Sequence, residues 1–305
     1  MSEKIKAVPK KPMNMAALLA DMEREDTDIA DVSELAPFSV AQALPRSPRS
    51  LPIAELTGLG KLLLMIGEGN AGKTVLARYV VDRLIQYGAL DSTVIAALAP
   101  GNRNLLQFVT TVMQPPTTDP KATGEYAHKI MVAMAKGHSS GTFDFGGGDA
   151  SMRYLIQAVP DLAPRMEDAG LALVPAYVLT PRSADLTFLK TYETMGFKPR
   201  ATALVLNLAR ADGGNARAFD GIRRQPEYKA AIARGAVELW MPAMPQEVAL
   251  RIERAKVQFS QARDGDAPEG GKPANISMIE RVMVREWLEA MDAEFKAVEG
   301  WMPWL

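Results

Sequence analysis

LLLMIGEGNAGKT, residues 62–74, is the stretch of the sequence that decides the fold. Its first residues, Leu62–Ile66, form a continuous apolar run that ends at a glycine, a pattern typical of a strand buried on both faces of a sheet. A helix is expected from Lys73 to Tyr87, because apolar residues recur there at helical spacing and a glycine follows as a stop signal. The stretch therefore predicts a buried strand, a glycine-rich turn and a helix in direct succession.

The turn carries the pattern G-x-x-x-x-G-K-[ST], or Walker A motif, without a mismatch. Glycines let backbone N–H groups point into the turn and let phosphate oxygens approach, while the positive end of the helix attracts an anion. In such a P-loop, Lys73 would neutralise the β- and γ-phosphates of a nucleotide and the Thr74 hydroxyl would hold Mg²⁺. The predicted nucleotide-binding residues of the loop are Gly67, Gly69, Asn70, Ala71, Gly72, Lys73, Thr74 and Val75.

An acidic residue at the end of a second strand should complete the magnesium shell. The segment GTFDFGGGD offers Asp144 at the end of a short apolar strand, Thr142–Phe145, followed by three glycines. Glycines suit a loop that moves when a γ-phosphate arrives. We therefore expect Asp144 to act on the metal together with Thr74. For Asp149 two interpretations stay open: it positions the attacking water, or it is the N-cap of the next helix.

The rest of the chain repeats a strand followed by a helix. This alternation predicts an α/β fold with a twisted, mainly parallel sheet and helices on both faces. The other strands are expected at Thr93–Leu98, Leu171–Leu179, Thr202–Asn207 and Ala236–Met241, and the other helices near Asn104–Met113 and Glu125–Lys136.

The last helix has the clearest start, because Ser277 and Glu280 form an S-x-x-E capping box. Its apolar residues repeat at i+4 and predict one buried stripe. The stripe consists of Ile279, Met283, Trp287, Met291 and Phe295.

Four parts of the chain are predicted from composition and pattern. Residues 1–55 mix proline with charged residues and are expected to form an N-terminal arm or linker, partly disordered. Residues 56–262 form the nucleotide-binding domain. Residues 263–275 form a linker loop, and residues 276–305 form a C-terminal helix that packs on the domain or on a partner.

The composition excludes several classes of protein. Hydrophobic residues make up 48% and charged residues 23% of the sequence, so most of the chain can bury a core. A net charge of −1 gives no global attraction to nucleic acid. The lack of cysteine rules out disulfides and Cys-ligated zinc. No apolar run approaches the roughly 18–20 residues that span a bilayer, and no secretory signal is evident, so a cytoplasmic location is expected.

Several segments, taken in order, resemble the ParA/MinD family of P-loop ATPases, which belongs to the SIMIBI class. FDFGGGD is similar to the family's aspartate and mobile glycine loop, and LVPAYVLTPRSADLTFLKTYETMG is similar to the strand, proline loop and helix that follow it. TALVLNLAR places Asn207 where the family has an asparagine near the base, and WMPAMPQEVALRIERA places Pro242 in a later proline loop. The resemblance covers about residues 60–260.

This resemblance implies a switch that binds ATP and Mg²⁺ and hydrolyses the nucleotide. It also implies an ATP-dependent homodimer or protein partner. The cellular role that it implies is plasmid or DNA partition, or conjugative transfer.

Two positions depart from the family. A signature lysine that reaches the partner's nucleotide lies five residues before the P-loop lysine in the family, and here that position is Glu68. A carboxylate beside phosphates is repelled unless it turns outward, pairs with a partner's cation or contacts Mg²⁺. GNxGKT is similar to divergent StbB-like plasmid stability and conjugation proteins. Ala99 and Pro100 stand where the family usually has a water-positioning aspartate, so we expect hydrolysis to be slow or stimulated by a partner.

Two other functions stay open. A nucleotide-binding scaffold with little hydrolysis is favoured by Ala99. A small-molecule kinase would need an acceptor-binding lid and a cluster of arginines that clamps phosphate, and the sequence shows no clear lid.

Two basic stretches and the C-terminus bear on partners. The basic residues are either solvated helix faces or contacts for non-specific DNA binding. They are Arg223, Arg224, Lys229 and Arg234, and then Arg251, Arg254, Lys256 and Arg263. The C-terminal FKAVEGWMPWL is expected to pack on the body or on a dimer partner. Membrane docking is disfavoured, because Pro303 breaks the helix and few cations flank the aromatic residues.

Overall fold

The computed structural model describes residues 44–48, 51–98, 103–109, 111–146, 150–268 and 270–305. Most of the predicted N-terminal arm lies outside the described residues, as do Ala99, Pro100 and Asp149. Within the described part of the chain, no helix combines the length and apolar character needed to cross a membrane.

The described residues form a six-stranded sheet in the order β2-β3-β1-β4-β5-β6, with every neighbouring pair parallel. This confirms the predicted α/β fold with a parallel sheet. The strands are β1 (Gly60–Ile66), β2 (Thr93–Ala97), β3 (Ser140–Asp144), β4 (Leu171–Leu179), β5 (Ala203–Asn207) and β6 (Val237–Met241).

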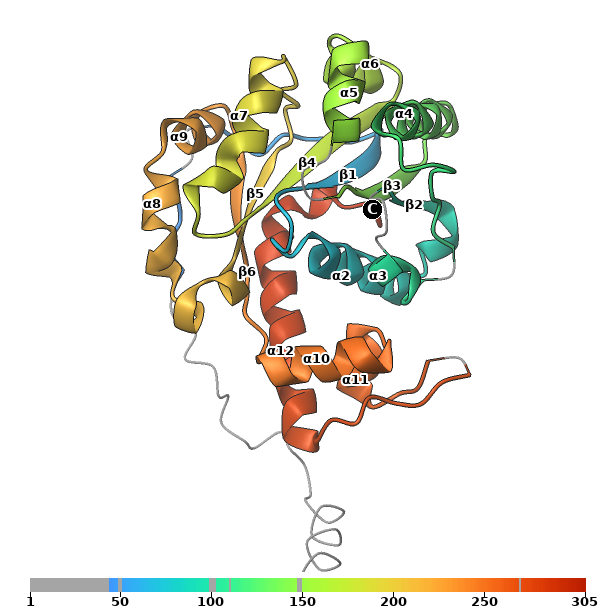
Figure 1. Ribbon diagram of the computed structural model, residues 1–305, viewed down its shortest axis with the longest axis vertical. Helices are drawn as coiled ribbons and strands as arrows, with labels where there is room; N and C mark the ends of the chain where they lie inside the picture. Colours follow the sequence, from blue (N-terminus) through green and yellow to red (C-terminus); the bar gives the residue numbers. More distant parts are fainter. Residues whose placement is uncertain (1–43, 49–50, 99–102, 110, 147–149, 269) are drawn as a thin grey trace, which may run out of the picture. The chain divides into compact units, whose positions relative to one another are not determined.

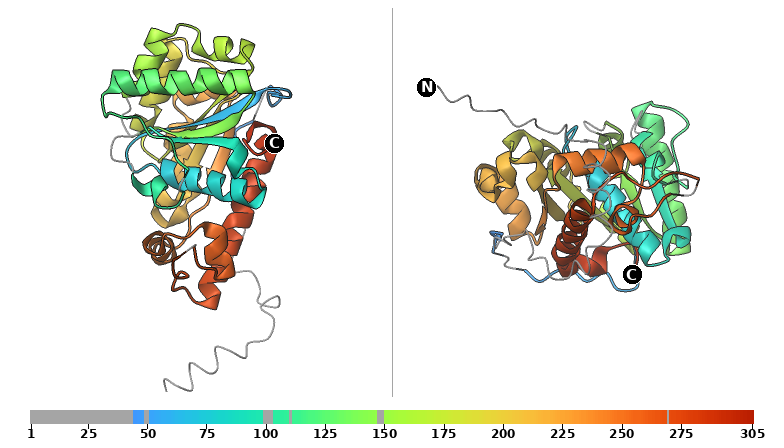
Figure 2. Two further views of the ribbon diagram at one scale, coloured as in Figure 1. Left: turned by 90° about the vertical axis from the view of Figure 1, so that its right-hand side faces the viewer. Right: turned by 90° about the horizontal axis from the view of Figure 1, so that it is seen from below.

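Helices cover both faces of the sheet (Figures 1 and 2). One face carries α2 (Lys73–Gln86), α3 (Arg103–Leu106), α10 (Gln246–Ala255), α11 (Phe259–Asp264) and α12 (Met278–Phe295). The other carries α4 (Pro120–Gly137), α5 (Ala150–Ala158), α6 (Leu162–Asp168), α7 (Thr187–Thr194), α8 (Asp220–Arg223) and α9 (Pro226–Ala233). Short 3-10 helices are η2 (Leu90–Ser92), η3 (Ser183–Leu186), η4 (Leu208–Arg210), η5 (Asp212–Gly214), η6 (Ala216–Phe219) and η7 (Lys296–Trp301).

The central strand β1 divides the core in two. Successive side chains of a strand point to opposite faces, so Leu63 and Met65 pack with the α2 side. Leu62, Leu64 and Ile66 pack with the α4 side. From Leu62 to Ile66 the strand is buried on both faces, which explains why this part of its sequence is a continuous apolar run.

The parallel arrangement brings the carboxyl ends of the strands to one edge of the sheet. Met65 is aligned with Asp144 of β3, and Ile66 with Tyr177 of β4. Asn207 ends β5 beside Met241, the last residue of β6. In parallel α/β sheets this edge is where ligands bind.

The prediction of a helix over Asn104–Met113 is wrong beyond the first turn. The helix α3 ends at Leu106, and Met113 instead forms an isolated parallel bridge with Ala96 of β2. The backbone N–H of Met113 donates to the Ile95 carbonyl at 2.8 Å. The physical reason is the sequence VTTVM, whose β-branched residues favour pairing with a strand over helix.

The capping box of α12 is confirmed, but its predicted stripe is partly wrong. The Ser277 hydroxyl accepts from the Glu280 N–H at 3.3 Å, and the Glu280 carboxylate accepts from the Ser277 N–H at 2.7 Å. Ile279 is 54% exposed. A strict i+4 row drifts by about 40° per step around a helix of 3.6 residues per turn, so its first member leaves the buried face. The fully buried apolar residues are Val284, Trp287, Leu288, Met291 and Phe295.

Residues at both ends of the described chain contact the body. Trp240 of β6 donates its indole N–H to the Pro45 carbonyl at 3.0 Å. At the C-terminus Trp301 is buried and donates to the Ala54 carbonyl at 2.7 Å, and Trp304 stacks on Tyr87. Residues 43–305 belong to one compact unit. The predicted domain boundaries within the chain stay predictions.

The helix α2, which follows the P-loop, is fixed to the C-terminal helices by a buried carboxylate. Asp82 is fully buried and accepts from the backbone N–H and the hydroxyl of Ser260, at 3.1 and 2.6 Å. It also pairs with Arg83 at 2.9 Å, and Arg83 reaches Asp292 of α12 at 3.3 Å. The network holds α2, α11 and α12 together.

Asp82→Ala should lower the free energy of unfolding by about 3–5 kcal/mol, because it leaves Arg83 and Ser260 without a buried partner. Urea unfolding measures this change. Asp264→Ala is the matched control: its carboxylate is 45% exposed, and its loss should cost under about 0.5 kcal/mol. Equal losses in the two variants would contradict the role given to Asp82.

Candidate functional site

Two glycines of the P-loop let neighbouring strands approach it closely. Gly67 and Gly72 have φ values of 154° and 108°, which L side chains rarely adopt. A Cβ on Gly67 would lie 2.5 Å from the Val178 carbonyl oxygen of β4. A Cβ on Gly72 would lie 2.3 Å from the Asn207 side-chain nitrogen of β5. The loop can take this shape only with glycine at both positions.

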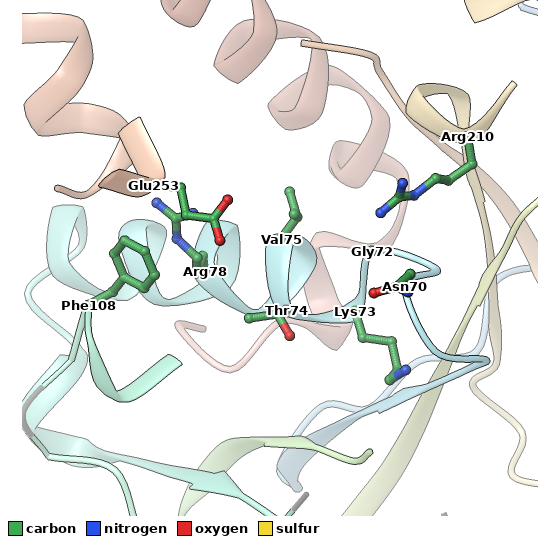
Figure 3. Close-up of a pocket in the computed structure, with 9 residues that line it drawn as sticks. All are labelled: Asn70, Gly72, Lys73, Thr74, Val75, Arg78, Phe108, Arg210 and Glu253. Carbon is green, nitrogen blue, oxygen red and sulfur yellow. The ribbon is translucent and has the colours of Figure 1, made fainter. Parts of the chain in front are cut away.

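Lys73 lies across the P-loop (Figure 3). It is 7% exposed, and its ammonium donates to the carbonyl oxygens of Gly67 at 2.9 Å and Glu68 at 2.8 Å. The charge is thus held inside the loop, where backbone N–H groups and the α2 N-terminus also favour an anion.

Thr74 and Asp144 meet as the sequence predicts. The Thr74 hydroxyl donates to the Asp144 carboxylate at 3.2 Å. Asp144 ends β3 and is 1% exposed. The two side chains come from elements 70 residues apart and are brought together by the pairing of β3 with β1. Their role toward a metal stays a prediction.

The donor set fits Mg²⁺ that is shared with phosphates. Mg²⁺ is usually bound by one or two protein oxygens plus waters and substrate phosphates. Thr74 and Asp144 supply such oxygens beside the P-loop. Among the described residues no group of three or more His, Cys, Asp or Glu side chains could hold a metal ion by itself.

Asn207 supports the loop from β5. Its amide nitrogen donates to the Ala71 carbonyl at 2.7 Å, and its amide oxygen accepts from the Ala209 N–H at 3.0 Å. It is 2% exposed. Both polar atoms are therefore used in fixing the backbone next to the P-loop.

Two adjoining cavities open beside the loop. The first has a volume of about 340 Å³ and includes Lys73, Thr74, Phe108 and Asn70 in its wall. The second has a volume of about 610 Å³ and is lined by Asn207 together with the largely apolar ends of β6 and α10. Residues that line both are Gly72, Val75, Arg78, Arg210 and Glu253. Because the two cavities share these residues, they lie side by side and together form the candidate site.

The remaining predicted residues are placed as follows. Pro242 lines the second cavity, and its carbonyl accepts from the Trp287 indole N–H at 2.9 Å. Gly69 faces open space. Val75 lines both cavities and is 38% exposed. Asp149 lies outside the described residues.

Glu68 contributes to the loop through its backbone. Its carbonyl accepts from the Lys73 ammonium and from the Ala71 N–H, the latter at 3.2 Å. The residue is half-buried and lines neither cavity.

Arg78 is a part of the cavity wall that the sequence analysis missed. It is 6% exposed, and its guanidinium carbon lies 3.5 Å from the centroid of the Phe108 ring and 4.6 Å from that of Phe259. One guanidinium nitrogen donates to the Val257 carbonyl at 3.1 Å. Burial lowers the pKa of Arg78 to about 10, because loss of hydration outweighs the attraction of Glu253.

The helical register is the signal that could have located Arg78. It follows Val75 by three residues and Thr74 by four, so all three lie on neighbouring positions of the α2 surface. Phe108, Glu253 and Phe259 carry no comparable signal, because only tertiary packing brings them to α2.

The comparisons with known proteins do not show a family for this chain. No family model matches the sequence, and no curated protein matches it. Among solved structures, the chain is similar to FtsY from Mycoplasma mycoides, with 12% sequence identity and a TM-score of 0.37. The match covers 76% of this chain and 68% of FtsY.

The fold and the loop define the class of protein on their own. A parallel sheet carries a P-loop between its central strand and the following helix, and an aspartate ends the adjacent strand. This is the fold of a P-loop NTPase.

Gly72→Ala should lower the free energy of unfolding by at least about 2 kcal/mol, because strain at positive φ adds to a clash with Asn207. Gly69→Ala is the matched control in the same loop, since a Cβ there meets nothing within 4 Å. It should change stability by less than about 0.5 kcal/mol. Urea unfolding of both variants checks the difference, and equal stabilities would contradict the packing described for Gly72.

Proposed function

We propose that the protein is an ATP-dependent switch of the ParA/MinD type, which binds Mg-ATP and hydrolyses it slowly. The observation that carries the proposal is the set of Lys73, Thr74 and Asp144, assembled at the carboxyl edge of the sheet. A cation, a hydroxyl and a carboxylate in this arrangement match what phosphoryl transfer needs from a P-loop protein.

Each side chain of the set has a distinct task in this proposal. The Lys73 ammonium exchanges the Gly67 and Glu68 carbonyls for phosphate oxygens, with which it forms stronger charge-assisted hydrogen bonds. The Thr74 hydroxyl and the Asp144 carboxylate orient the magnesium shell. Mg²⁺, held by Thr74 and Asp144, would supply positive charge that offsets the charge of the phosphates.

The second cavity is proposed to hold the nucleoside. It adjoins the P-loop through Gly72 and includes Asn207, which the resemblance places near the base, and Pro242, which it implies in nucleotide binding. Its apolar wall suits the faces of a purine ring. The apolar residues of that wall include Leu208, Met241, Met244, Leu250 and Trp287. ATP is the nucleotide proposed, and competition with GTP tests that choice.

The proposed output is an ATP-dependent association with a second copy or with a protein partner. A switch needs only different affinities of its two states for ATP and ADP, and hydrolysis then limits the lifetime of the ATP state. Slow turnover is compatible with this role. The cellular process proposed is plasmid or DNA partition, or conjugative transfer, in the cytoplasm.

Non-specific DNA binding would need basic side chains that are free to contact phosphates, and several of the candidate arginines pair with carboxylates instead. Arg223 pairs with Glu238 at 3.0 Å, and Arg234 pairs with Glu193. In the second basic stretch Arg251 pairs with Glu280 at 3.1 Å and Arg263 with Asp264 at 2.6 Å. These pairs reduce the positive charge available to phosphates. The exposed Arg224, Lys229, Arg254 and Lys256 are the residues left for non-specific contacts.

A nucleotide-binding scaffold is the second candidate, favoured by Ala99 and Pro100 at the position where the family has an aspartate. A scaffold binds ATP without releasing phosphate. Phosphate release with Mg-ATP, measured with and without DNA, separates the two candidates.

Lys73→Ala should weaken ATP binding at least about tenfold, because hydrogen bonds to charged groups contribute about 1.5–3 kcal/mol. Titration calorimetry with Mg-ATP measures the affinity, and thermal unfolding shows whether the fold is intact. Lys129→Ala is the control, since this exposed lysine lies on α4, over the other face of the sheet. Unchanged ATP affinity in a folded Lys73→Ala protein would overturn the site assignment.

The mass in solution should double with Mg-ATP but not with Mg-ADP or without nucleotide. Light scattering under the three conditions measures it. The result would show that the association survives the replacement of the family's lysine by Glu68. An unchanged mass, in a protein that binds ATP, would mean that the protein acts through a different partner.

A further inference from the structure

Arg78 is a buried cation, and within the described part of the chain no carboxylate forms a salt bridge with it. By contrast, the buried Arg83 pairs with Asp82, and the partly buried Arg223 pairs with Glu238. Among the described residues, the polar contact of the Arg78 guanidinium is the Val257 carbonyl, and its Nε has no hydrogen-bond partner. Burying a charge in this way is unfavourable unless an anion binds to it.

The surroundings of Arg78 leave only part of its guanidinium open to a ligand. Phe108 and Phe259 lie against it at 3.5 and 4.6 Å, which favours the cation and limits its rotation. Arg78 nevertheless lines both cavities. A guanidinium held in one orientation can offer its N–H groups to an anion at a defined position.

The position of Arg78 on α2 indicates which anion it can reach. Arg78 follows Thr74 by one turn of α2 and lines the same cavity as Lys73 and Thr74, with its guanidinium on the side of Phe108 and Glu253 (Figure 3). Lys73 extends toward the interior of the loop, where it meets the Gly67 carbonyl (Figure 3). The two cations therefore serve different ends of the site.

In the proposed complex the terminal phosphates contact Lys73, and the nucleoside occupies the second cavity. The nucleotide then has to pass along the first turn of α2. The group that lies there is the α-phosphate, which joins the nucleoside to the other phosphates. Glu253 also borders both cavities, and its negative charge offsets part of the Arg78 charge. The wall near Arg78 therefore suits a single phosphate group and not the terminal end of a triphosphate.

We propose that Arg78 is a ligand-binding residue that binds the α-phosphate of the nucleotide. The inference rests on the proposed function, since it needs a nucleotide at the P-loop. Because AMP, ADP and ATP all have an α-phosphate, Arg78 contributes equally to the three. The P-loop lysine contributes only where β- or γ-phosphates are present.

The test compares the affinities of wild type and Arg78→Gln for adenosine, AMP, ADP and ATP. Magnesium is present throughout, and ligand-observed NMR extends the range to millimolar dissociation constants. We expect Arg78→Gln to weaken AMP, ADP and ATP by a similar factor, about tenfold, and to leave adenosine unchanged. Lys73→Ala should instead weaken ADP and ATP and spare AMP.

Two further variants keep the test decisive. Arg254→Gln is the control, because this exposed arginine of α10 lines neither cavity. Arg78→Lys keeps the charge and loses the planar fork, and it should show a smaller loss with the same pattern. It replaces Arg78→Gln if the glutamine variant does not fold.

Two results would overturn the inference while the proposed function stands. One is equal weakening of adenosine and AMP, which would give Arg78 a structural role. The other is unchanged affinity for all four ligands in the variant. If wild type binds none of the phosphorylated ligands, the proposed function fails, and the inference fails with it.

Discussion

The close approach of the Gly72 backbone to the Asn207 amide is the contact on which the candidate site depends. With no side chain at Gly72, the amide reaches the Ala71 carbonyl at 2.7 Å and joins the end of β5 to the P-loop. On its other side the loop rests against β4, where Gly67 leaves room for the Val178 carbonyl. The sheet therefore sets the shape of the loop before any phosphate binds, and a preorganised site loses less free energy on binding.

The C-terminal helices belong to the site as much as the P-loop does. They hold α2 through Asp82 and through the bond from the Tyr79 hydroxyl to Asp292, at 2.8 Å. They also supply Glu253, Phe259 and Trp287 to the walls of the cavities. The second half of the helix that positions Lys73 and Thr74 is thus supported by residues more than 170 positions later in the chain.

The features that the sequence predicts well are local or periodic. The strand before the P-loop is recognisable because burial on both faces leaves only apolar residues, and Asp144 because it ends such a strand. The meeting of Thr74 with Asp144 follows from parallel pairing. These arguments need no knowledge of distant residues.

The features that the sequence misses depend on tertiary packing. Arg78 borders the site only because Phe108 and Phe259 fold against it from separate segments. The sequence predicts a helix at Met113, yet Met113 pairs with Ala96 at the edge of β2, and this pairing outweighs the weak helical pattern. Glu68 departs from the family's pattern by its charge, yet it contributes to the P-loop through its backbone carbonyl, which accepts from the Lys73 ammonium.

The outer edge of β6 has a consequence for assembly. The Trp240 N–H of this last strand donates to the Glu294 carboxylate at 3.0 Å, and the neighbouring Glu238 carbonyl accepts from Arg46 at 3.5 Å. Arg46 and Glu294 pair with each other as well. Side chains thus occupy the backbone groups that another strand would need. For two copies of this protein to join at β6 into a continuous sheet, these bonds would first have to break.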